Sequence, residues 1–248
     1  MEGEKIKLNY KNEESAVLKP IPAPLDSEYQ EVAWGLPKWG ENFAPMVINR
    51  GKIGDHDCRL EMHYCGVCHT DVHVSLNHLG GQNYPVCAGH ELLGVITEVG
   101  PKVTKVKVGD KCGIGCLADC CLECDACKNN DEQHCLKYGF CHVYGDSKKK
   151  YTPGNPDTQT FGGYTGSITV YEHFLIKIPD SLDFEKTAPL LCAGITMYDP
   201  LRIHGATEKP GQTIGVIGVG GLGVMGLKLA KAMGHKVVAI STSDKKEA

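Results

Sequence analysis

The sequence predicts a mixed β and α/β chain, in which a β-rich antiparallel part is followed by the start of a doubly wound parallel sheet. Short runs of Val, Ile and Thr, broken by Gly, Pro and Asn, fill residues 47–108 and are typical of an antiparallel sheet or barrel. Residues 213–217 form an apolar strand, followed by a glycine turn, a helix at 222–233 and a second strand at 236–240. This order predicts a βαβ unit.

The composition favours a globular protein that binds a small molecule. Of 248 residues, 42% are hydrophobic and 23% are charged, and the net charge is -4. Nucleic acids and anionic membranes need a basic protein face, so neither is expected as a partner. The amino terminus has no apolar run like a secretory signal, and no segment approaches the ~18 apolar residues of a membrane span. We therefore expect a cytoplasmic protein with no membrane contact.

The chain divides into three parts that differ in composition and residue pattern. Residues 1–32 are polar and proline-containing and are expected to form an extended leader. Residues 33–181 hold the β-rich domain, including a cysteine-rich lobe at 112–145 that has little periodic pattern. Residues 182–248 hold the incomplete α/β domain, because a parallel sheet needs more strands than this sequence supplies.

Four further segments have a pattern that predicts one secondary structure. Residues 94–100, 103–108 and 174–178 are apolar and β-branched and predict strands, whereas residues 183–198 predict a helix.

Closely spaced cysteines predict a structural zinc site. Thirteen cysteines, an odd number, in a chain without an export signal do not favour a disulfide scaffold. A C-x2-C-x2-C-x7-C run can close a tetrahedral shell around zinc, and its members are Cys121, Cys124, Cys127 and Cys135. A bacterial iron–sulfur run has a last gap of three residues followed by Pro, whereas Leu136 follows here. Unligated thiols are the other alternative, and Cys120 could replace Cys121, although the spacing favours Cys121.

An ordered series of motifs runs from Trp34 to the last residue. The motifs lie at residues 65–73, 89–100, 109–113, 121–135, 161–164, 192–196 and 218–223. Taken singly, His90 could be a buried core histidine and Cys192 a small buried hydrophobic residue. Taken in this order, the motifs resemble the zinc-containing medium-chain alcohol dehydrogenases, and within them the cinnamyl alcohol dehydrogenase-like branch.

The resemblance implies a GroES-like β-barrel catalytic domain, a Rossmann nucleotide-binding domain and a catalytic zinc. It assigns this zinc to Cys68, His90 and Cys192, which leaves the fourth position for water or substrate and brings the expected total to two zinc ions per chain. Cys65 is a rival by its Cys-x-x-Cys spacing, but in the resemblance it is only a neighbour. Glu91 matches an acidic residue that approaches the metal when the substrate site is empty; orienting a ligand is its alternative role.

The resemblance also implies a proton relay. Zinc would polarise the alcohol or aldehyde oxygen, and the cofactor would exchange the hydride. Thr70 matches the hydroxyl next to the zinc, and His73 matches the imidazole that passes the proton to solvent. Outside this motif, both would be ordinary turn or surface residues.

A glycine-rich turn between a strand and a helix predicts a dinucleotide site. Backbone amides at such a helix start can hold a pyrophosphate, and the residues concerned are Gly218, Gly220, Gly221, Leu222 and Gly223. The resemblance also places His69 near the phosphates and Thr196 near the nicotinamide.

The end of the second α/β strand favours NADP over NAD. An NAD enzyme places an acidic residue there to bind the ribose hydroxyls. This chain has Ser241, Thr242 and Ser243 instead, with Lys245 and Lys246 close behind, and these groups suit a 2′-phosphate. Asp244 is the competing candidate, but it lies beyond the strand end.

Together these features predict a zinc-dependent, NADP-linked dehydrogenase acting on a small-molecule primary alcohol or aldehyde. A polyol dehydrogenase is an alternative within the family, and a non-catalytic zinc-binding scaffold or truncated inactive paralogue is the alternative outside it. The family domain extends about 100 residues further, so we expect this chain alone to be inactive or unstable. The family's homodimer also depends on that portion.

Overall fold

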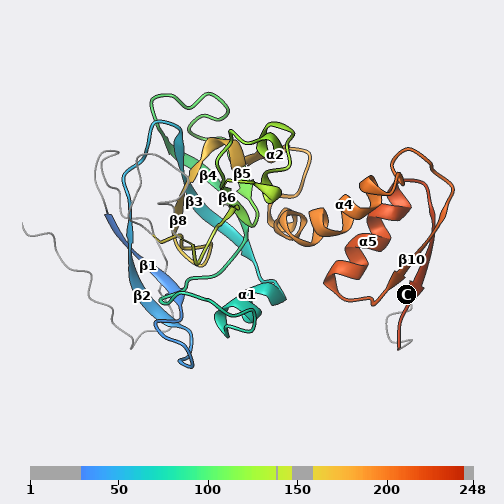
Figure 1. The fold of residues 1–248 in the computed structure, drawn as a ribbon, viewed down its shortest axis with the longest axis horizontal. Helices are drawn as coiled ribbons and strands as arrows, with labels where there is room; N and C mark the ends of the chain where they lie inside the picture. Colours follow the sequence, from blue (N-terminus) through green and yellow to red (C-terminus); the bar gives the residue numbers. More distant parts are fainter. Residues whose placement is uncertain (1–28, 138, 147–158, 243–248) are drawn as a thin grey trace, which may run out of the picture. The chain divides into compact units, whose positions relative to one another are not determined.

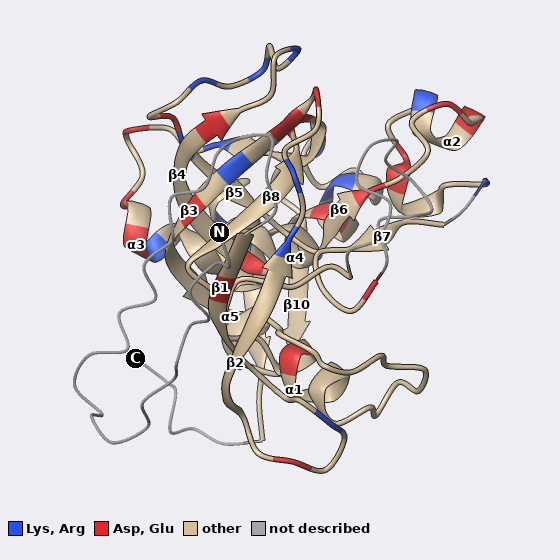
Figure 2. Cartoon of the chain, turned by 90° about the vertical axis from the view of Figure 1, so that its left-hand side faces the viewer, with Lys and Arg blue, Asp and Glu red and all other residues tan. Residues whose placement is uncertain are grey.

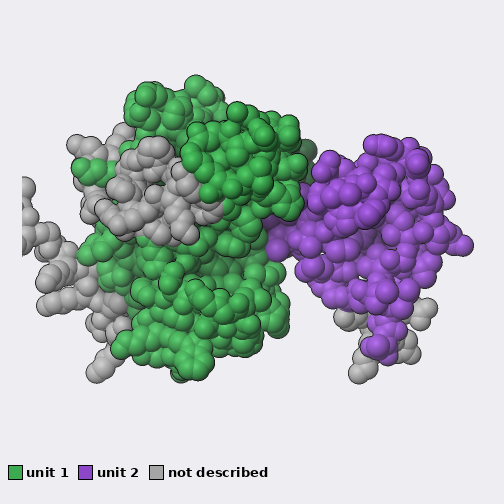
Figure 3. Space-filling view, in the orientation of Figure 1, with its two compact units in different colours: residues 1–188 green, residues 189–248 purple. Residues whose placement is uncertain are grey.

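The computed structural model describes residues 29–137, 139–146 and 159–242, which belong to two compact units, Met1–Ala188 and Pro189–Ala248 (Figures 1 and 3). The boundary between the units lies seven residues after the expected one at 181/182. Within the described residues, no helix has both the length and the apolar character needed to cross a bilayer. Acidic and basic residues are interspersed along the ribbon in Figure 2.

A five-stranded antiparallel sheet is the centre of the first unit. Its strands lie in the order β8, β3, β4, β5, β9. They span Asp57–Gly66 (β3), Glu91–Val99 (β4), Lys111–Ile114 (β5), Ser167–Tyr171 (β8) and Ile176–Lys177 (β9). The main core lies on this sheet, and its fully buried members include Leu60, Leu92, Ile96, Ile114 and Val170. The antiparallel sheet predicted for this part of the sequence is therefore present.

A two-stranded antiparallel hairpin packs beside this sheet. It consists of β1 (Tyr29–Gly35) and β2 (Ala44–Arg50), and isolated bridges join Ala33 to Thr165 and Leu36 to Val86. Residues 29–32, which we expected in the leader, are thus part of a strand, because β2 provides hydrogen-bonding partners that the local sequence does not reveal. The rest of the expected leader, residues 1–28, lies outside the described residues.

The strand predicted at residues 103–108 is absent. The backbone N–H groups of Thr104 and Lys105 each donate to Oε2 of Glu172 at 2.7 Å and do not pair with a neighbouring strand. His56 Nδ1 lies 2.8 Å from the other carboxylate oxygen of Glu172. A buried carboxylate therefore satisfies the donors that a β-ladder would otherwise have used.

Two other predicted elements are shorter than expected. Phe174 ends a 3-10 turn, η3 (Glu172–Phe174), so strand β9 covers only part of residues 174–178. The helix expected at 183–198 is divided into α3 (Phe184–Thr187), a 3-10 turn η4 (Ala188–Leu191) and α4 (Ala193–Ile203). Pro189 lacks an N–H, and Cys192 has φ -126° and ψ -72°, so a continuous helix cannot pass through this segment.

The cysteine-rich lobe has little regular structure, as predicted. Apart from the end of β5, the elements in its described residues are short, and they are β6 (Leu117–Asp119), α2 (Asp125–Lys128), the 3-10 turn η1 (Glu132–His134) and β7 (Cys141–His142). Its small core consists of the side chains of cysteines, joined by Leu122 and Phe174.

The second unit contains the predicted βαβ unit. Strands β10 (Thr213–Ile217) and β11 (Lys236–Ile240) pair in parallel, and α5 (Gly221–Ala232) connects them. Gly218, at the end of β10, has φ +87°, a conformation that favours glycine. A Cβ atom on Gly223 would collide with the carbonyl oxygen of Gly218. Both glycines are therefore required for the tight turn into α5.

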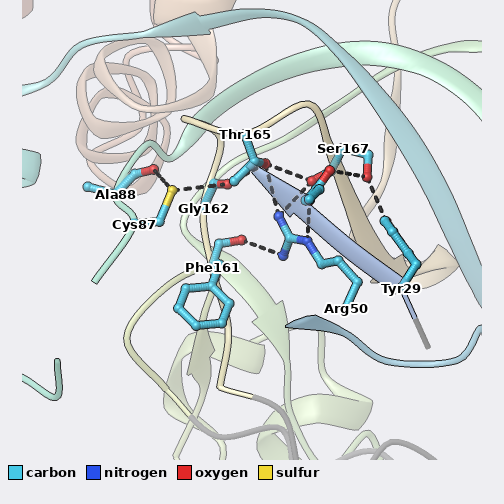
Figure 4. Close-up of polar contacts among 9 residues, drawn as sticks. Tyr29, Arg50, Cys87, Ala88, Phe161, Gly162, Thr165 and Ser167 are labelled. Atoms are coloured by element: carbon cyan, nitrogen blue, oxygen red, sulfur yellow. Dashed lines mark hydrogen bonds and ion pairs between the residues drawn. The ribbon is translucent and has the colours of Figure 1, made fainter. Parts of the chain in front are cut away.

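Arg50 joins the two strands of the β1–β2 hairpin by a buried ion pair and ties the hairpin to the segment that follows residue 159 by hydrogen bonds (Figure 4). Arg50 Nε donates to Glu31 Oε1 at 2.6 Å, and the side chains are 7% and 1% exposed. The other guanidinium nitrogens donate to the carbonyl of Phe161, the hydroxyl of Thr165 and the carbonyl of Ser167 at 3.0, 2.9 and 2.6 Å. Every charged hydrogen bond formed by Arg50 is thus made in the interior.

Replacing Arg50 with Met should therefore destabilise the first unit strongly. The change leaves Glu31 buried without its cation, and breaking such a pair costs about 3–5 kcal/mol of unfolding free energy. Urea unfolding followed by tryptophan fluorescence reports on the change, because Trp34 lies on β1. Lys102→Met, which breaks the exposed Lys102–Asp55 pair, is the control and should leave the midpoint nearly unchanged. Equal midpoints for the two variants would show that the Arg50 pair does not hold the hairpin.

The carboxylate of Glu172 should make stability depend on pH in the acid range. Burial would raise its pKa, but the hydrogen bonds from His56, Lys105 and Thr104 outweigh burial and lower the pKa below 4.5. A lowered folded pKa means that the stabilisation is complete above pH 4.5 and is lost as the pH falls through the folded pKa. Glu172→Gln should thus lower the unfolding free energy on the order of 1–3 kcal/mol at pH 7, and this deficit should shrink as the pH falls below 4.5 and through the folded pKa. Urea unfolding of the wild type and the variant at pH 7 and at an acid pH measures the difference in unfolding free energy. An equal difference at the two pH values would contradict this account.

Candidate functional site

Helix α1 (His69–Ser75) begins directly after Cys68, and its third residue, Asp71, fixes that start. One carboxylate oxygen of Asp71 accepts a hydrogen bond from the Cys68 backbone N–H at 3.1 Å. A carboxylate at this position also interacts favourably with the positive end of the helix. The thiol of Cys68 is therefore held at a defined helix start.

Asp71 is also the acceptor around which the rest of the site is arranged. Its Oδ1 accepts from the Gly89 N–H at 2.9 Å and lies 2.8 Å from His90 Nδ1, and its Oδ2 accepts from the Tyr164 hydroxyl at 3.0 Å. The residue is 2% exposed. Burial would raise the pKa of Asp71, but the hydrogen bonds from His90, Gly89 and Cys68 outweigh burial and hold the pKa below 3.8. Asp71 is therefore ionised at neutral pH.

An ionised Asp71 determines which nitrogen of His90 can bind a metal. A carboxylate only accepts hydrogen bonds, so the proton of a neutral His90 ring resides on Nδ1 and Nε2 has the lone pair. Metal-bound histidines commonly donate their other N–H to a carboxylate in this way. The His90 side chain is 1% exposed, which limits the orientations that the ring can adopt.

Ligand atoms of Cys68, His90 and Glu91 lie within 4.8 Å of one another. His90 precedes β4 and Glu91 is its first residue, so the sheet positions both. Burial raises the pKa of Glu91, and the nearby Asp71 charge raises it further against the influence of His90. A thiol, an imidazole and a carboxylate are a donor set suited to zinc.

Cys65 is not part of this cluster in the described residues. It lies on β3, its thiol donates to the Gly66 carbonyl at 3.5 Å, and it packs against Gly89 and Gly163. Burial raises the pKa of Cys65 to about 12, so the thiol stays protonated. Cys65 is thus a partly buried thiol packed against the core, and its exclusion from the catalytic zinc site remains a prediction.

Cys192 lies in the second unit, at the cap position before α4. Its carbonyl accepts the N–H of Thr196 at 2.9 Å, which fixes the first turn of that helix. Its role as a zinc ligand, and that of Thr196 near the nicotinamide, remain predictions.

The four cysteines of the predicted structural site lie together. Ligand atoms of Cys121, Cys124, Cys127 and Cys135 are all within 4.8 Å of one another. Sulfur–sulfur distances from Cys127 are 3.8 Å to Cys121 and 3.5 Å to Cys124. A tetrahedral shell with Zn–S bonds of about 2.3 Å would place its sulfurs about 3.8 Å apart. The distances therefore fit a zinc ion.

Backbone N–H groups donate hydrogen bonds to sulfurs of this quartet, which is the environment expected of thiolates. The N–H groups of Cys124 and Leu136 lie 3.3 Å from the sulfurs of Cys121 and Cys124 respectively. The hydrogen bond from the Cys127 backbone, assisted by that from Leu136 and opposed by burial, lowers the pKa of Cys124 to about 6. Cys120 Sγ lies 3.6 Å from Cys127 Sγ but belongs to no such cluster among the described residues, so Cys121 is the better ligand.

The predicted relay and phosphate residues of the first unit lie on α1. His69 and Thr70 are exposed, and His73 is half-buried. Residues three and four apart share one face of a helix, so Thr70 and His69 both lie on the side of His73. The rings of His69 and His73 meet edge to face, with centroids 4.6 Å apart.

The glycine loop of the second unit is open. A Cβ atom on Gly220 or Gly221 would meet nothing within 4 Å, so a phosphate can approach the backbone at the start of α5. Leu222 and Gly223 follow in the first turn. Ser241 and Thr242 are exposed at the end of β11, whereas Ser243, Asp244, Lys245 and Lys246 lie outside the described residues.

The family model for the alcohol dehydrogenase GroES-like domain matches residues 54–180, which is half of the chain. The chain belongs to the medium-chain alcohol dehydrogenase family, in its cinnamyl alcohol dehydrogenase-like branch. Cinnamyl alcohol dehydrogenase 8 of Arabidopsis thaliana is 45% identical to this chain, and the match covers 88% of this chain and 58% of the relative. NADP-dependent alcohol dehydrogenase C 1 of Mycolicibacterium smegmatis is 48% identical, over 83% of the chain and 57% of that protein. The chain thus spans well under two thirds of these relatives.

Solved structures agree with the predicted fold class. The structure of CAD from Helicobacter pylori, complexed with NADP(H), is 35% identical and superposes with a TM-score of 0.81 over 89% of this chain and 61% of that one. Cinnamyl alcohol dehydrogenase from Sorghum bicolor gives 36% identity and a TM-score of 0.80, over 88% and 60%. The prediction of a GroES-like domain followed by part of a Rossmann-type domain is confirmed.

Sequence reasoning missed Asp71 and Tyr164 as parts of the site. Both lie within the family motifs at residues 65–73 and 161–164, and Asp71 is three residues after Cys68, the spacing of a capping carboxylate. That spacing was the available signal for its contact with Cys68. Its contacts with Gly89, His90 and Tyr164 depend on chain separations of 18 to 93 residues, which the sequence pattern does not reveal.

Asp71→Asn should weaken zinc binding by the Cys68–His90 site roughly 10–100-fold. The amide cannot stabilise the Nδ1–H of His90 as a carboxylate does, so the ligand is less basic and less firmly oriented. Chelator competition measures the affinity, and zinc held by the Cys121 quartet is the internal control. Tyr164→Phe removes a single donor to Asp71 and should have a smaller effect. An unchanged affinity in Asp71→Asn would contradict a role for this carboxylate.

Proposed function

We propose that this chain is the zinc- and NADP-binding part of a dehydrogenase that interconverts a primary alcohol and an aldehyde. The observation that supports it most directly is the buried Asp71–His90 hydrogen bond of 2.8 Å beside Cys68, because it orients an imidazole for a metal. A scaffold stabilised by the cysteine quartet would have no need of this arrangement.

We infer that Cys192 joins Cys68 and His90 as the third ligand of this zinc. Two thiolates and one imidazole leave a coordination position open, which a catalytic zinc requires. Glu91, whose carboxylate lies within 4.8 Å of the Cys68 and His90 ligand atoms, is suited to occupy that position when no substrate does. The quartet would hold a second, structural zinc.

When bound, the zinc would polarise the substrate oxygen and the nicotinamide would exchange the hydride. The protein's own residues would position these groups and move the proton. Asp71 keeps His90 in one tautomer, and Thr70 and His73, three residues apart on α1, would lead the alcohol proton toward solvent.

The cofactor preference rests on the end of β11. Ser241 and Thr242 lie exposed where an NAD enzyme would have a carboxylate, and hydroxyls suit a 2′-phosphate. The open loop at Gly220 and Gly221 supports pyrophosphate binding. His69 is proposed to face the phosphates.

The substrate class follows from the relatives by analogy. Relatives named cinnamyl alcohol dehydrogenase favour an aromatic or allylic primary alcohol. Mannitol dehydrogenase of Petroselinum crispum, 45% identical over 82% of the chain and 58% of that protein, keeps a polyol as the second candidate. Homodimer formation by the whole protein is proposed on the same family basis.

Metal and nucleotide measurements on the purified chain test this proposal. We expect two zinc ions per chain, one of which is lost in Cys68→Ser because a serine hydroxyl is a poor zinc ligand. NADPH should bind more tightly than NADH to the wild-type chain, and fluorescence titration measures both. Cys58→Ser, at a buried thiol in the sheet core, is the matched control and should keep both zinc ions. One zinc per wild-type chain together with no nucleotide affinity would favour the zinc-binding scaffold.

A further inference from the structure

A tyrosine at the end of the cysteine-rich lobe lies against the Asp71–His90 pair. Tyr144 is 6% exposed, and its ring belongs to the main core of the first unit. Its hydroxyl oxygen lies 3.4 Å from Nδ1 of His90. The two rings are tilted by 47° with centroids 6.0 Å apart, so they do not stack. The polar contact with His90 therefore comes from the hydroxyl of Tyr144.

This hydroxyl also interacts with the carboxylate of Asp71. Nδ1 of His90 has a single hydrogen and donates it to Asp71 at 2.8 Å, so the longer contact gives Tyr144 a minor share of that hydrogen. Burial, the negative charge of Asp71 and a hydrogen bond to its carboxylate raise the pKa of Tyr144. Tyr164 donates to Oδ2 of the same carboxylate at 3.0 Å. The Asp71–His90 hydrogen bond is thus accompanied by two tyrosine hydroxyls from different segments.

Tyr144 is placed by the stem of the cysteine-rich lobe, which consists of β6 and β7. The four cysteines of the structural site lie between these two paired strands in the sequence. The pairing continues past β7, where the N–H of Val143 donates to the Cys116 carbonyl at 2.8 Å. On the other side of Tyr144, the N–H of Gly145 donates to the Thr160 carbonyl at 2.9 Å. The backbone of Tyr144 is therefore fixed by its two neighbours, and one of these depends on the stem.

The stem in turn depends on the cysteines that it encloses. The small core of the lobe consists of cysteine side chains joined by Leu122 and Phe174, which is little apolar surface for a folded lobe. In small domains of this kind, the free energy of metal binding is part of the free energy of folding. A zinc ion in the quartet would therefore order the stem, and with it Tyr144.

We propose that Tyr144 couples the two zinc sites of this chain. An ordered lobe holds the Tyr144 hydroxyl at Asp71 and His90, and this contact limits the orientations of the His90 ring. Zinc in the quartet thereby strengthens zinc binding by Cys68 and His90, and the effect is reciprocal because the two binding equilibria are linked. Tyr144 acts through His90, so it is a positioning residue. This role rests on the proposed zinc-binding function of Cys68 and His90.

Chelator competition for the zinc held by Cys68 and His90 tests the coupling. Tyr144→Phe keeps the ring and removes the hydroxyl, and it should weaken this zinc roughly three- to tenfold, as expected for one lost hydrogen bond. Tyr171→Phe, at a tyrosine of β8, is the matched control and should bind zinc like the wild type.

A double-mutant cycle tests whether the lobe acts through Tyr144. Cys124→Ser disables the quartet and should weaken the zinc at Cys68 and His90 as well. Adding Tyr144→Phe to Cys124→Ser should cause little further loss, because the hydroxyl is then no longer held in place. If Cys124→Ser does not fold, Asp146→Ala replaces it in the cycle. That change removes the acceptor of the His142 N–H in β7 and leaves every cysteine intact.

NMR of ¹⁵N-labelled histidine gives a readout that does not depend on bound metal at Cys68 and His90. The Nδ1–H resonance of His90 is assigned by its loss in His90→Gln. It should shift in Tyr144→Phe, because an oxygen beside this proton is removed, and it should keep its position in Tyr171→Phe.

An unshifted His90 resonance or an unchanged zinc affinity in Tyr144→Phe would overturn the proposal. Additive losses in the double variant would also overturn it, because the lobe would then act by another route. A wild-type chain that binds no zinc through Cys68 and His90 would contradict the proposed function. In that case the resonance still decides whether the Tyr144 hydroxyl contacts His90.

Discussion

The buried carboxylate of Asp71 is the interaction on which the proposed zinc site depends. It receives hydrogen bonds from the start of α1, from the Gly89–His90 segment before β4 and from Tyr164. These contacts join segments that are distant in sequence, and the lowered pKa of Asp71 keeps the carboxylate charged. A charged acceptor in the interior must have all its donors in place, because an unmatched charge there is costly. The geometry of Cys68 and His90 is therefore fixed by the same interaction that stabilises the fold around them.

The framework behind Asp71 is also maintained by buried polar contacts. Arg50 binds Glu31 and the backbone carbonyls of Phe161 and Ser167, on either side of Tyr164. The N–H of Trp34 donates to the Tyr164 carbonyl at 2.8 Å. The backbone of Tyr164 is consequently fixed by the β1–β2 hairpin, while its hydroxyl donates to Asp71. This arrangement physically connects the hairpin to the site, although the hairpin contributes no ligand.

The chain combines two kinds of cysteine that composition alone does not separate. Cys121 and Cys124 have sulfurs that accept backbone N–H groups, an environment that favours thiolates and hence metal binding. Cys58 and Cys87 lie in the interior and Cys65 is partly buried against the core, and burial raises the pKa of each to about 12. Those thiols behave as small apolar side chains. The environment of the sulfur therefore separates Cys121 and Cys124 from the thiols of the sheet core.

The sequence by itself determined the features that depend on neighbours along the chain. Alternating and continuous apolar runs predicted the sheet and the βαβ unit. The short spacing of Cys121, Cys124 and Cys127 predicted that their sulfurs lie together, because side chains only three residues apart can bind the same ion. Tertiary structure decided what depends on distant partners. Residues 103–108 do not form the predicted strand, because the carboxylate of Glu172 accepts their backbone N–H groups. Residues 29–32 form a strand because they pair with β2. Asp71 lies within hydrogen-bonding distance of His90, which is 19 residues away in the sequence. Local pattern cannot reveal these outcomes, because the donor or acceptor that decides each one is supplied by another segment of the fold.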